Sequence, residues 1–543
     1  MLCAFLVLNC TLPVTADSAV APSIHEINHR SYEELKMYSG YSFTDDREMY
    51  FYNNDMFYNV SDNTYRYNRW SKGIYSYLAE NADGTFTRVE PLGWRVHYSS
   101  ATGSWYYDEA TGQYVNPGFD NLQYTGPDGI AVENYSKDLT LLSEKIIDMP
   151  LPLFGGFFSG KDYNFVVVGQ ENPDASDSAE VVRFLKYSKS WELLDSCSVY
   201  GANTTIPFDA GCVRMTETAG KLYAHTCHEM YSGHQANMTF VLDEADFTIK
   251  EQSYRVWNIS SGYVSHSFNQ FIVTDGTNIY RVDHGDAHPR SVVVVKSAVD
   301  GSIESTQNAD AFSIKQGSTG DNDTGVCVGG VALGDNNIII AGGTEDQENS
   351  ENFGNNKRNI FLSVVSKDLR TVKLVMLTSY GADTDIRTYT PQLVKTGENS
   401  FLVMWEEYDT VKKSVTTCCV GVDENGNAIT DVVRQPIRLS DCQPILCSDG
   451  TVKWYVSTGK NTVAYSIPAA NPGASFLCGD VDGDGVSNCY DAALILRCEV
   501  GLADKPLLLS NGDANSDGKV DNYDATLILQ YEVALIDSLP VRQ

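Results

Sequence analysis

Two short segments near the C-terminus carry oxygen-bearing side chains at the spacing of a calcium-binding loop. Residues 480–491 and 513–524 begin 33 residues apart, and 13 of the 24 aligned pairs that start at Gly479 and Gly512 are identical, which indicates an internal duplication. Calcium binds about six to eight oxygens, and a twelve-residue loop supplies them from positions 1, 3, 5, 7, 9 and 12. The predicted ligands of two Ca²⁺ ions are Asp480, Asp482, Asp484, the Val486 carbonyl, Asn488 and Asp491 in the first loop, and Asp513, Asn515, Asp517, the Lys519 carbonyl, Asp521 and Asp524 in the second.

Each loop is followed by one apolar helical segment, residues 492–500 and 525–533, and neither is preceded by an amphipathic helix. Position 12 is Asp in both copies, where an ordinary EF-hand has Glu. A domain of about 65 residues buries little apolar surface, so ion binding must contribute folding free energy. An acidic turn without an ion is the alternative, and the duplication argues against it.

A calcium loop with an exiting helix, present twice, resembles a dockerin, the module that docks an extracellular protein onto a scaffold. The resemblance covers residues 477–543 and implies a cohesin module of a scaffold protein as the partner. In dockerins the residues that read the partner lie at loop positions 10 and 11 and on the exposed face of the following helix. By resemblance these are Cys489, Tyr490, Arg497, Asn522, Tyr523 and Gln530.

The dockerin resemblance leaves the cohesin subtype open. Many clostridial dockerins carry Ser-Thr at positions 10 and 11, and this chain does not. Its Leu-Ile-Leu-Gln-Tyr run, residues 527–531, is more similar to ruminococcal dockerins. Tyr490 and Tyr523 fit partner contact and packing against the helices equally well, because tyrosine serves cores and interfaces alike.

Composition and charge narrow the class of protein. The 543 residues include 39 basic and 71 acidic side chains, a net charge of −32 without a basic run. Nucleic acid and anionic membranes are therefore not expected partners, because both require a positive surface. The thirteen cysteines show no Cys-x-x-Cys metal pattern, so buried thiols are the expectation, although Cys418, Cys419, Cys442 and Cys447 have the proximity to pair.

The first residues predict secretion. Residues 1–16 form a short apolar run that ends in Val-x-Ala, which is typical of a signal peptide, with cleavage after Ala16 or Ala21. The first basic residue is Arg30, so the usual basic start is missing and the chain can begin upstream. Lipid attachment at Cys10 is a weaker alternative because Asn9 precedes it. We find no later apolar stretch of the roughly 18 residues that a membrane span requires.

The long middle region, residues 30–467, is predicted to be mainly β and to form a β-propeller. One hairpin pattern recurs at residues 157–168, 213–224, 268–280, 331–340, 393–404 and 445–455. A second hairpin turns between most of these, and two hairpins per period make a four-stranded blade. Seven blades are favoured and six are the alternative; the seventh would come from residues 45–90, with strands shared with residues 462–466. Two stacked sandwiches fit the sustained period less well.

Two further segments interrupt this pattern. Residues 94–128 are rich in Tyr, Trp and Gly and form an insertion, which suits β-packing better than stacking on sugar rings. Residues 468–476 are rich in Pro, Ala, Asn and Gly and predict a short linker before the dockerin.

Chain order also predicts a polar rim. In a propeller blade, the loop between the second and third strands and the connection to the next blade open on the same side. Six of the nine histidines lie between residues 225 and 288, in segments that fall on this side. The candidate ligand-binding residues of the rim are Gln170, Asn172, Asp209, His225, His234, Gln235, Asn237, His266, Asp283 and His284.

Three kinds of chemistry are open for the rim. Paired carboxylates can flank a glycosidic bond as acid and base, and three imidazoles with a carboxylate can hold zinc, although His-x-x-His on a strand puts the two rings on opposite faces. Polar side chains can also simply satisfy the backbone of the loops. The candidate catalytic residues are Glu171, His228, Glu229, Asp286 and His288.

The stretch from residue 154 to about 293 resembles an uncharacterised family of secreted bacterial propeller modules. The resembling runs include residues 168–172, 207–211, 225–231, 234–240, 263–270 and 283–290. This resemblance implies an architecture and no reaction. Together with the dockerin it predicts a secreted, cellulosome-type component that contacts plant polysaccharide. A catalytic propeller, acting as hydrolase or lyase, and a structural or host-contact surface protein are the alternatives.

Overall fold

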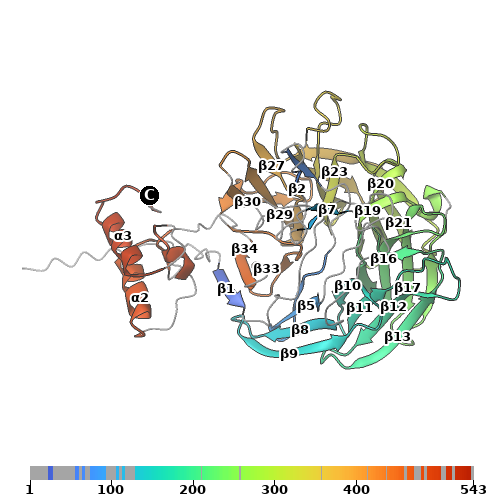
Figure 1. The fold of residues 1–543 in the computed structure, drawn as a ribbon, viewed down its shortest axis with the longest axis horizontal. Coiled ribbons are helices and arrows are strands. Elements are labelled where there is room, and N and C mark those ends of the chain that lie inside the picture. Colours follow the sequence, from blue (N-terminus) through green and yellow to red (C-terminus); the bar gives the residue numbers. More distant parts are fainter. Residues whose placement is uncertain are drawn as a thin grey trace, which may run out of the picture. The chain divides into compact units, whose positions relative to one another are not determined.

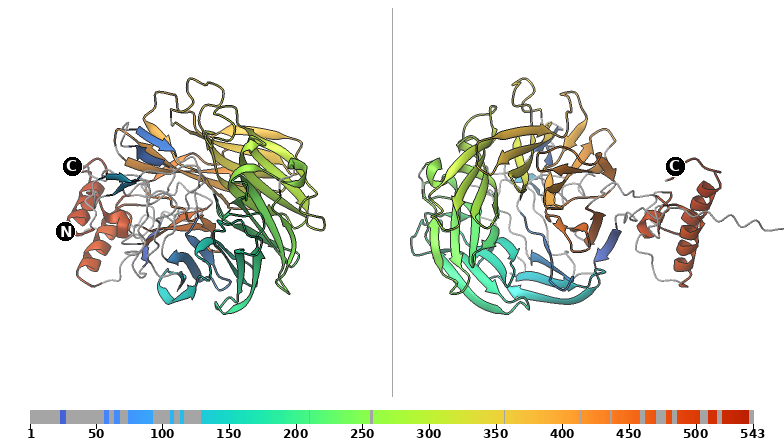
Figure 2. Two further views of the ribbon diagram at one scale, coloured as in Figure 1. Left: turned by 45° about the vertical axis from the view of Figure 1, so that its right-hand side comes forward. Right: turned by 180° about the vertical axis from the view of Figure 1, so that it is seen from behind.

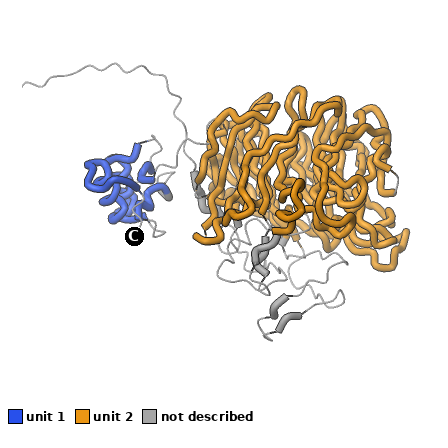
Figure 3. The backbone as a smooth tube through the Cα atoms, turned by 90° about the horizontal axis from the view of Figure 1, so that it is seen from above, with its two compact units in different colours: residues 1–24, 474–543 blue, residues 25–473 orange. Residues whose placement is uncertain are grey.

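The computed structural model describes residues 23–27, 56–59, 64–67, 74–92, 106–108, 113–115 and 129–539, apart from gaps at 210, 256–257, 356, 413, 436, 458–461, 470–477, 482–485, 503–508 and 516–519. Contacts divide the chain into two compact units (Figure 3): unit 1 holds residues 1–24 and 474–543, and unit 2 holds residues 25–473. The division after residue 473 falls within the predicted linker, 468–476. The predicted signal peptide lies outside the described residues.

The chain is mainly β, and the sheets of unit 2 follow one another around a common axis in a propeller-like arrangement (Figures 1 and 2). Within each sheet the strands are antiparallel, and most strands pair with their sequence neighbours. The first two sheets are β4 (Tyr77–Glu80), β5 (Phe86–Leu92), β8 (Gly129–Tyr135) and β9 (Leu141–Asp148), then β10 (Leu153–Ser159), β11 (Asn164–Gly169), β12 (Glu180–Tyr187) and β13 (Leu193–Tyr200).

The next sheet has nine strands and contains two successive four-stranded meanders. One residue pair, Ala236 with Ser265, joins them. The strands are β14 (Ile206–Pro207), β15 (Arg214–Thr218), β16 (Lys221–Glu229), β17 (Gln235–Asp243), β18 (Ile249–Ser253), β19 (Ser265–Thr274), β20 (Asn278–His288), β21 (Ser291–Ala298) and β22 (Gln307–Ser313), with the 3-10 helix η3 (Ile259–Ser261) between the meanders.

The remaining sheets complete the circuit. The last of them pairs β1, from near the start of the chain, with β34. The strands are β23 (Val326–Leu333), β24 (Asn337–Thr344), β25 (Asn359–Ser366) and β26 (Val372–Met376); β27 (Ile386–Thr388), β28 (Gln392–Lys395), β29 (Ser400–Asp409), β30 (Ser414–Asp423) and β31 (Val433–Gln435); and β32 (Ile445–Leu446), β33 (Thr451–Ser457), β34 (Thr462–Pro468) and β1 (Ser23–Ile27).

The structure corrects two expectations about the blades. By strand pairing, the described residues form six sheets of four or more strands and not seven, because the pair Ala236–Ser265 merges β15–β18 with β19–β22. The expected sharing of strands between residues 45–90 and residues 462–466 is also wrong. β4 and β5 of the first region lie in one sheet, whereas β34 pairs with β33 and β1 in another. An edge strand is stabilised by any free neighbour of matching register, so the sequence alone does not show which end of the chain supplies the partner.

The predicted hairpins are confirmed. Each recurring pattern forms the first two strands of a meander, for example β10 with β11 and β33 with β32. The chain between β5 and β8 contains residues 94–128, and two short hairpins lie in the N-terminal third of the chain. The hairpins are β2 (Met56–Asn59) with β3 (Thr64–Tyr67), and β6 (Tyr106–Asp108) with β7 (Gln113–Val115), the latter within the insertion.

Apolar cores fill the space between successive sheets. β11 is buried along its whole length, whereas β13 at the outer edge of the same sheet is mostly exposed. The second strand of a meander is covered on both faces by neighbouring sheets, so it is a continuous apolar run such as Val166–Val168. In one such core, Phe184 of β12 packs edge to face on Phe240 of β17, with ring centroids 5.4 Å apart.

Buried polar groups join the first sheet to the last. Asp441 accepts hydrogen bonds from the backbone N–H groups of Tyr75 (2.8 Å) and Ser76 (2.9 Å). Arg88 of β5 binds Glu133 of β8 (2.5 Å) and lies 4.7 Å from the ring centroid of Tyr455 on β33. The circuit of sheets therefore closes through contacts between residues more than 360 positions apart.

The described part of unit 1 contains two helices of equal length, α2 (Cys489–Glu499) and α3 (Asn522–Glu532), and a 3-10 turn, η4 (Leu509–Gly512). Its small apolar core repeats with the sequence period, because Val481, Ala492 and Ile495 are matched by Ala514, Ala525 and Ile528. No helix among the described residues is long and apolar enough to cross a bilayer.

Candidate functional site

The two predicted calcium loops enter their helices through identical capping boxes. Asn488 and Asp521 are the N-caps, and each side chain accepts from the N–H two residues ahead, at 2.7 and 2.8 Å. Asp491 accepts from the N–H of Asn488 (2.9 Å), and Asp524 accepts from that of Asp521 (2.9 Å). The last ligand position of each loop is thus also the third residue of the helix, which fixes its carboxylate in place.

The second oxygen of each terminal carboxylate turns back into its own loop. Asp491 accepts from Val481 N (2.8 Å), and Asp524 accepts from Ala514 N (2.9 Å) and Asn515 N (3.2 Å). Both side chains are fully buried. Burial raises the pKa of Asp524 above its usual value, with the charge of Asp513 adding to the effect, while backbone N–H donors oppose it.

This donor set fits calcium. Burial disfavours the charged form of a carboxylate, backbone N–H donors favour it, and a hard divalent cation would stabilise it further. Asn511 keeps the two loops together, because its side chain donates to Asp480 O (2.9 Å) and its carbonyl accepts from Gly479 N (2.7 Å). Asp482, Asp484, Asp517 and Lys519 lie outside the described residues, and Val481 and Val486 flank the gap in the first loop.

The predicted cohesin-contact residues are largely exposed. Tyr490 is 72% exposed and Tyr523 is 49% exposed, so neither packs into the core of unit 1. Cys489, Arg497 and Asn522 are also exposed, and Gln530 is half-buried. Exposed aromatic residues at matching positions of both repeats are suited to binding a partner protein.

The rim of unit 2 brings together the two kinds of loop that chain order predicted. Asn172, in the loop between β11 and β12, donates to Thr204 O (3.0 Å) in the connection that follows β13, and its N–H donates to Thr205 O (2.7 Å). The side chain of Asn172 is buried and holds the loop by accepting from the N–H of Ser176. Gln170 donates to Glu180 O (2.7 Å). Both predicted rim residues therefore hold loop backbone.

Asp209 and Glu171 lie close enough to Glu229 for its charge to affect the pKa of both. Asp209 is 1% exposed and accepts from Gln235 Nε2 (2.7 Å). Burial raises the pKa of Asp209 to about 7, with the Gln235 hydrogen bond opposing and the charges of Glu229 and Glu171 adding to the rise. Glu229 is buried and accepts from Thr205 Oγ1 (2.9 Å). Glu171 is exposed, and partial desolvation together with the charge of Glu229 raises its pKa. Carboxylates that share a site in this way can divide into acid and base.

A buried polar network links β16 with β20. His225 is fully buried and bridges Thr239 Oγ1 (2.9 Å) and Asp283 (3.0 Å). Asp283 also accepts from Asn237 (3.2 Å) and Ser267 (2.6 Å). Burial would raise the pKa of Asp283, but His225, Ser267 and Arg281 outweigh it and hold the pKa below its usual value. These predicted rim residues thus lie inside the wall between two meanders.

His228 and His284 are buried separately. His228 Nδ1 bonds Thr204 Oγ1 (2.7 Å), and His284 Nε2 bonds Thr324 Oγ1 (2.9 Å). Burial lowers the pKa of each to about 3, so both rings are neutral at physiological pH. Each is fixed to a connection between meanders.

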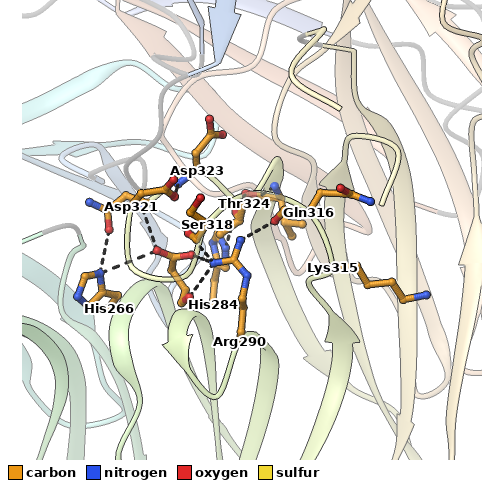
Figure 4. Close-up of polar contacts among 12 residues, drawn as sticks. His266, His284, Arg290, Lys315, Gln316, Ser318, Asp321, Asp323 and Thr324 are labelled. Carbon is orange, nitrogen blue, oxygen red and sulfur yellow. Dashed lines mark hydrogen bonds and ion pairs between the residues drawn. The ribbon is translucent and has the colours of Figure 1, made fainter. Parts of the chain in front are cut away.

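Asp286 anchors a connection of the rim through Arg290 (Figure 4). Arg290 binds the Asp286 carboxylate and donates to Gln316 O (2.5 Å) and Ser318 O (3.1 Å). Asp286 also accepts from Asn322 N (2.8 Å), and His266 Nδ1 lies 3.0 Å from Asn322 Oδ1. Asp286 is fully buried in this pairing, whereas His288 is exposed at the end of β20.

The zinc alternative does not hold. His234 bonds Ser265 Oγ (2.5 Å) and lies edge to face with His266, with ring centroids 4.7 Å apart. Among the described residues, which include all six clustered histidines, no three His, Cys, Asp or Glu side chains are arranged to hold a metal ion. His225 and His228 lie on opposite faces of their strand, as their spacing indicated, and the histidines bond separate partners.

Sequence reasoning missed the residues on the axis of the ring. Arg214, Gln270 and Gln392 line a small cavity there, together with residues from most of the innermost strands. Two of the lining strands, β19 and β23, bulge at this level, between Phe268 and Phe271 and between Val328 and Gly330. Bulges leave little trace in a hydrophobic pattern, so no sequence signal marked these positions.

The C-terminal segment matches a known family. Residues 478–531 match the dockerin type I domain. Type I dockerins bind calcium and dock to cohesins, and they are typical of extracellular cellulosome components. The search of curated proteins finds no match.

Several solved structures resemble part of this chain weakly. The endo-arabinase of Bacteroides thetaiotaomicron is 11% identical, with a TM-score of 0.28, over 59% of this chain and 94% of that one. The α-L-arabinanase of Cellvibrio cellulosa is 8% identical, with a TM-score of 0.29, over 51% and 94%. A subtype N10 neuraminidase-like protein of A/little yellow-shouldered bat/Guatemala/060/2010 is 11% identical, with a TM-score of 0.35, over 64% and 96%. Likeness at this level assigns no activity.

Calcium should stabilise unit 1 and not unit 2. We expect the full chain to lose its unit 1 unfolding transition, followed by calorimetry, when a chelator replaces 1 mM calcium; saturation at about 100 times Kd is worth about 2.7 kcal/mol. Asp524→Asn should reduce this gain, because Asn cannot supply the charge, whereas the exposed Asp537→Asn should retain it. Equal unfolding midpoints with and without chelator would contradict the calcium assignment.

Asp209 should make stability depend on pH. Its folded pKa of about 7 exceeds its usual 3.8, so the folded state binds the proton more tightly and loses stability as pH rises from about 4 through 7. Asp209→Asn removes this cost. The unfolding free energy of the variant, relative to that of wild type, should rise by up to about 4 kcal/mol between pH 4 and pH 8. Chemical unfolding at both pH values measures the difference. Asp174→Asn, at an exposed site of the same rim, is the control, and a pH-independent difference refutes the prediction.

Proposed function

We propose that this chain is a secreted component of a cellulosome-type assembly. Its dockerin binds a cohesin of a scaffold protein in a calcium-dependent way, with one Ca²⁺ in each loop, and its propeller contacts plant polysaccharide. The observation that carries the proposal is the duplicated loop and helix at residues 478–531, where both copies have the same capping box and the same buried terminal carboxylate.

The partner surface in unit 1 follows from exposure. Tyr490 and Tyr523 stand at equivalent positions at the start of α2 and α3, and both are solvent-exposed. An aromatic side chain that is exposed in the free protein contributes large contact area at low entropic cost when a partner covers it. We therefore assign the N-terminal turns of α2 and α3 to the cohesin contact, with Cys489, Arg497, Asn522 and Gln530 around them.

One observation favours a catalytic propeller as the second candidate. A general acid must hold a proton near neutral pH, and the pKa of about 7 at Asp209 meets this requirement. Glu229 supplies a second carboxylate, and the exposed Glu171 is the member that a substrate on the rim would meet first. This arrangement suits hydrolysis of a glycosidic bond, in which one carboxyl protonates the leaving oxygen while the other acts as base or nucleophile.

Docking is tested with cohesin modules. We expect the full chain to bind a cohesin in 1 mM calcium and to release it in chelator. The double variant Tyr490→Ala with Tyr523→Ala should weaken binding by more than about tenfold, because two central aromatic contacts are lost. Tyr200→Ala, a tyrosine of unit 2 with 58% exposure, is the matched control and should bind as wild type does. Binding that persists in chelator would disprove the calcium-dependent mode.

Contact with polysaccharide is tested by retention on insoluble plant glycans and by release of reducing ends. Retention without release identifies a binding module. Release that falls by about a hundredfold or more in Glu171→Gln or Glu229→Gln identifies catalysis, with Glu192→Gln, on a turn between β12 and β13, as control. A chain that neither retains nor cleaves any glycan, yet still binds cohesin, would be a structural or host-contact protein.

A further inference from the structure

The two repeats of unit 1 contact each other where their calcium loops begin. Residues 478–480 of the first repeat correspond to residues 511–513 of the second, 33 positions later. Gly479 N donates to Asn511 O (2.7 Å), and Asn511 Nδ2 donates to Asp480 O (2.9 Å). Asp480 is the first predicted ligand of its loop, so the backbone of this ligand is held by a side chain of the other repeat.

The corresponding bond in the reverse direction is weaker. Cys478 is the residue of the first repeat that corresponds to Asn511, and its thiol donates to Asp513 O at 3.7 Å. A thiol is a weak donor, whereas the amide of Asn511 is a strong one. The duplication therefore retains the geometry of two reciprocal bonds between the loops, and only the bond from Asn511 is strong.

The packing between the repeats is reciprocal as well. A Cβ on Gly479 would lie 3.1 Å from Cγ1 of Ile528, which belongs to α3 of the second repeat. A Cβ on Gly512 would lie 2.9 Å from Cδ1 of Ile495, which belongs to α2 of the first repeat. Both isoleucines are buried in one apolar core. Each loop therefore begins against the helix that follows the other loop.

Each helix is also tied to its own loop. Asp491 is both the last predicted ligand of the first loop and the third residue of α2, and Asp524 has the same two roles in the second loop and α3. When Asp524 is held by an ion, α3 and Ile528 are held with it, and so is the surface against which the first loop begins. Part of the conformational entropy that the first loop loses on ordering has then already been lost, and the same applies in reverse.

We infer that the two loops bind calcium cooperatively and that Asn511 is the side chain that couples them. Its bond to Asp480 O joins the starts of both loops, so it is fully made only when both are ordered, and its free energy favours the doubly loaded state over either singly loaded one. The inference rests on the proposed calcium-dependent docking and adds a form of regulation to it. A unit whose two loops fill together docks over a narrow range of calcium concentration.

The test is a calorimetric calcium titration of the full chain, in competition with a chelator and with a thiol reductant present. The double variant Asp480→Ala with Asp513→Ala is the blank for calcium bound elsewhere. We expect the second ion to bind wild type more tightly than two independent sites allow. Asn511→Cys, which gives both repeats the same residue, should lower the ratio of the second stepwise affinity to the first by about fivefold, because the strong bond between the loops is lost.

The duplication also supplies a variant with the opposite effect. Cys478→Asn places the amide in both repeats and should raise the ratio by about fivefold. Ala493→Ser, at an exposed position of α2, is the control and should leave the ratio unchanged. A unit 1 unfolding transition at saturating calcium shows that a variant is folded, and a shift in the expected direction in either folded variant supports the inference.

Two results overturn the inference and leave calcium-dependent docking standing. One is a wild-type ratio no larger than that of independent sites, and the other is a ratio that neither folded variant changes. Calcium binding by wild type that does not exceed the blank overturns both the inference and the calcium-dependent docking on which it rests.

Discussion

Closure of the ring is the constraint on which unit 2 depends. Each sheet buries apolar side chains on both faces of its inner strands, so the first and last sheets must cover one another or leave those faces in water. The structure achieves this with directional bonds, from Asp441 to the backbone of residues 75 and 76 and from Ser448 to Glu80. Arg88 and its partner carboxylates are buried in the same seam. A buried charge group of this kind is costly to break, and it fixes which two sheets meet.

Closure also explains why the rim is rigid. Once the sheets are held in a circuit, each connection between meanders lies beside a loop of the neighbouring meander, and both contain backbone groups that need partners. Asn172 meets that need, and so does Arg290 where it holds the connection at residues 316–322, while His228 and His284 bond threonine hydroxyls of two such connections. Most of the conspicuous polar residues of this face therefore hold the loops and connections in place. The carboxylates around Asp209 and the amides on the axis are the groups that architecture does not use fully.

The sequence predicted what depends on local pattern. The hairpins, their turns and the calcium loops could be predicted because the alternation of apolar and polar residues, the turn residues and the ligand spacing are local features, and a duplication repeats them. It did not predict that β1 would complete the last sheet, or that a single pair at Ala236 would join two meanders, because both depend on which edge a strand meets in space. Among the site residues, His225 and Asp283 were found by their types, but their burial in the wall was not. Gln270 was missed because a bulge in β19, and not sequence spacing, places it beside the cavity that Gln392 also lines.

The two units differ in what prepares each of them to bind a partner or ligand. In unit 1 the buried carboxylates of Asp491 and Asp524 are held ready by backbone N–H groups, so an ion can order the loops and, through the shared capping boxes, set the helices that present Tyr490 and Tyr523. We therefore expect docking by this unit to depend on the calcium concentration of the medium. In unit 2 the rim and axis are built by closure alone, and the buried His225–Asp283 pair and the neutral His228 and His284 need no ion. A ligand site on such a frame is preorganised, whether or not the tail is docked.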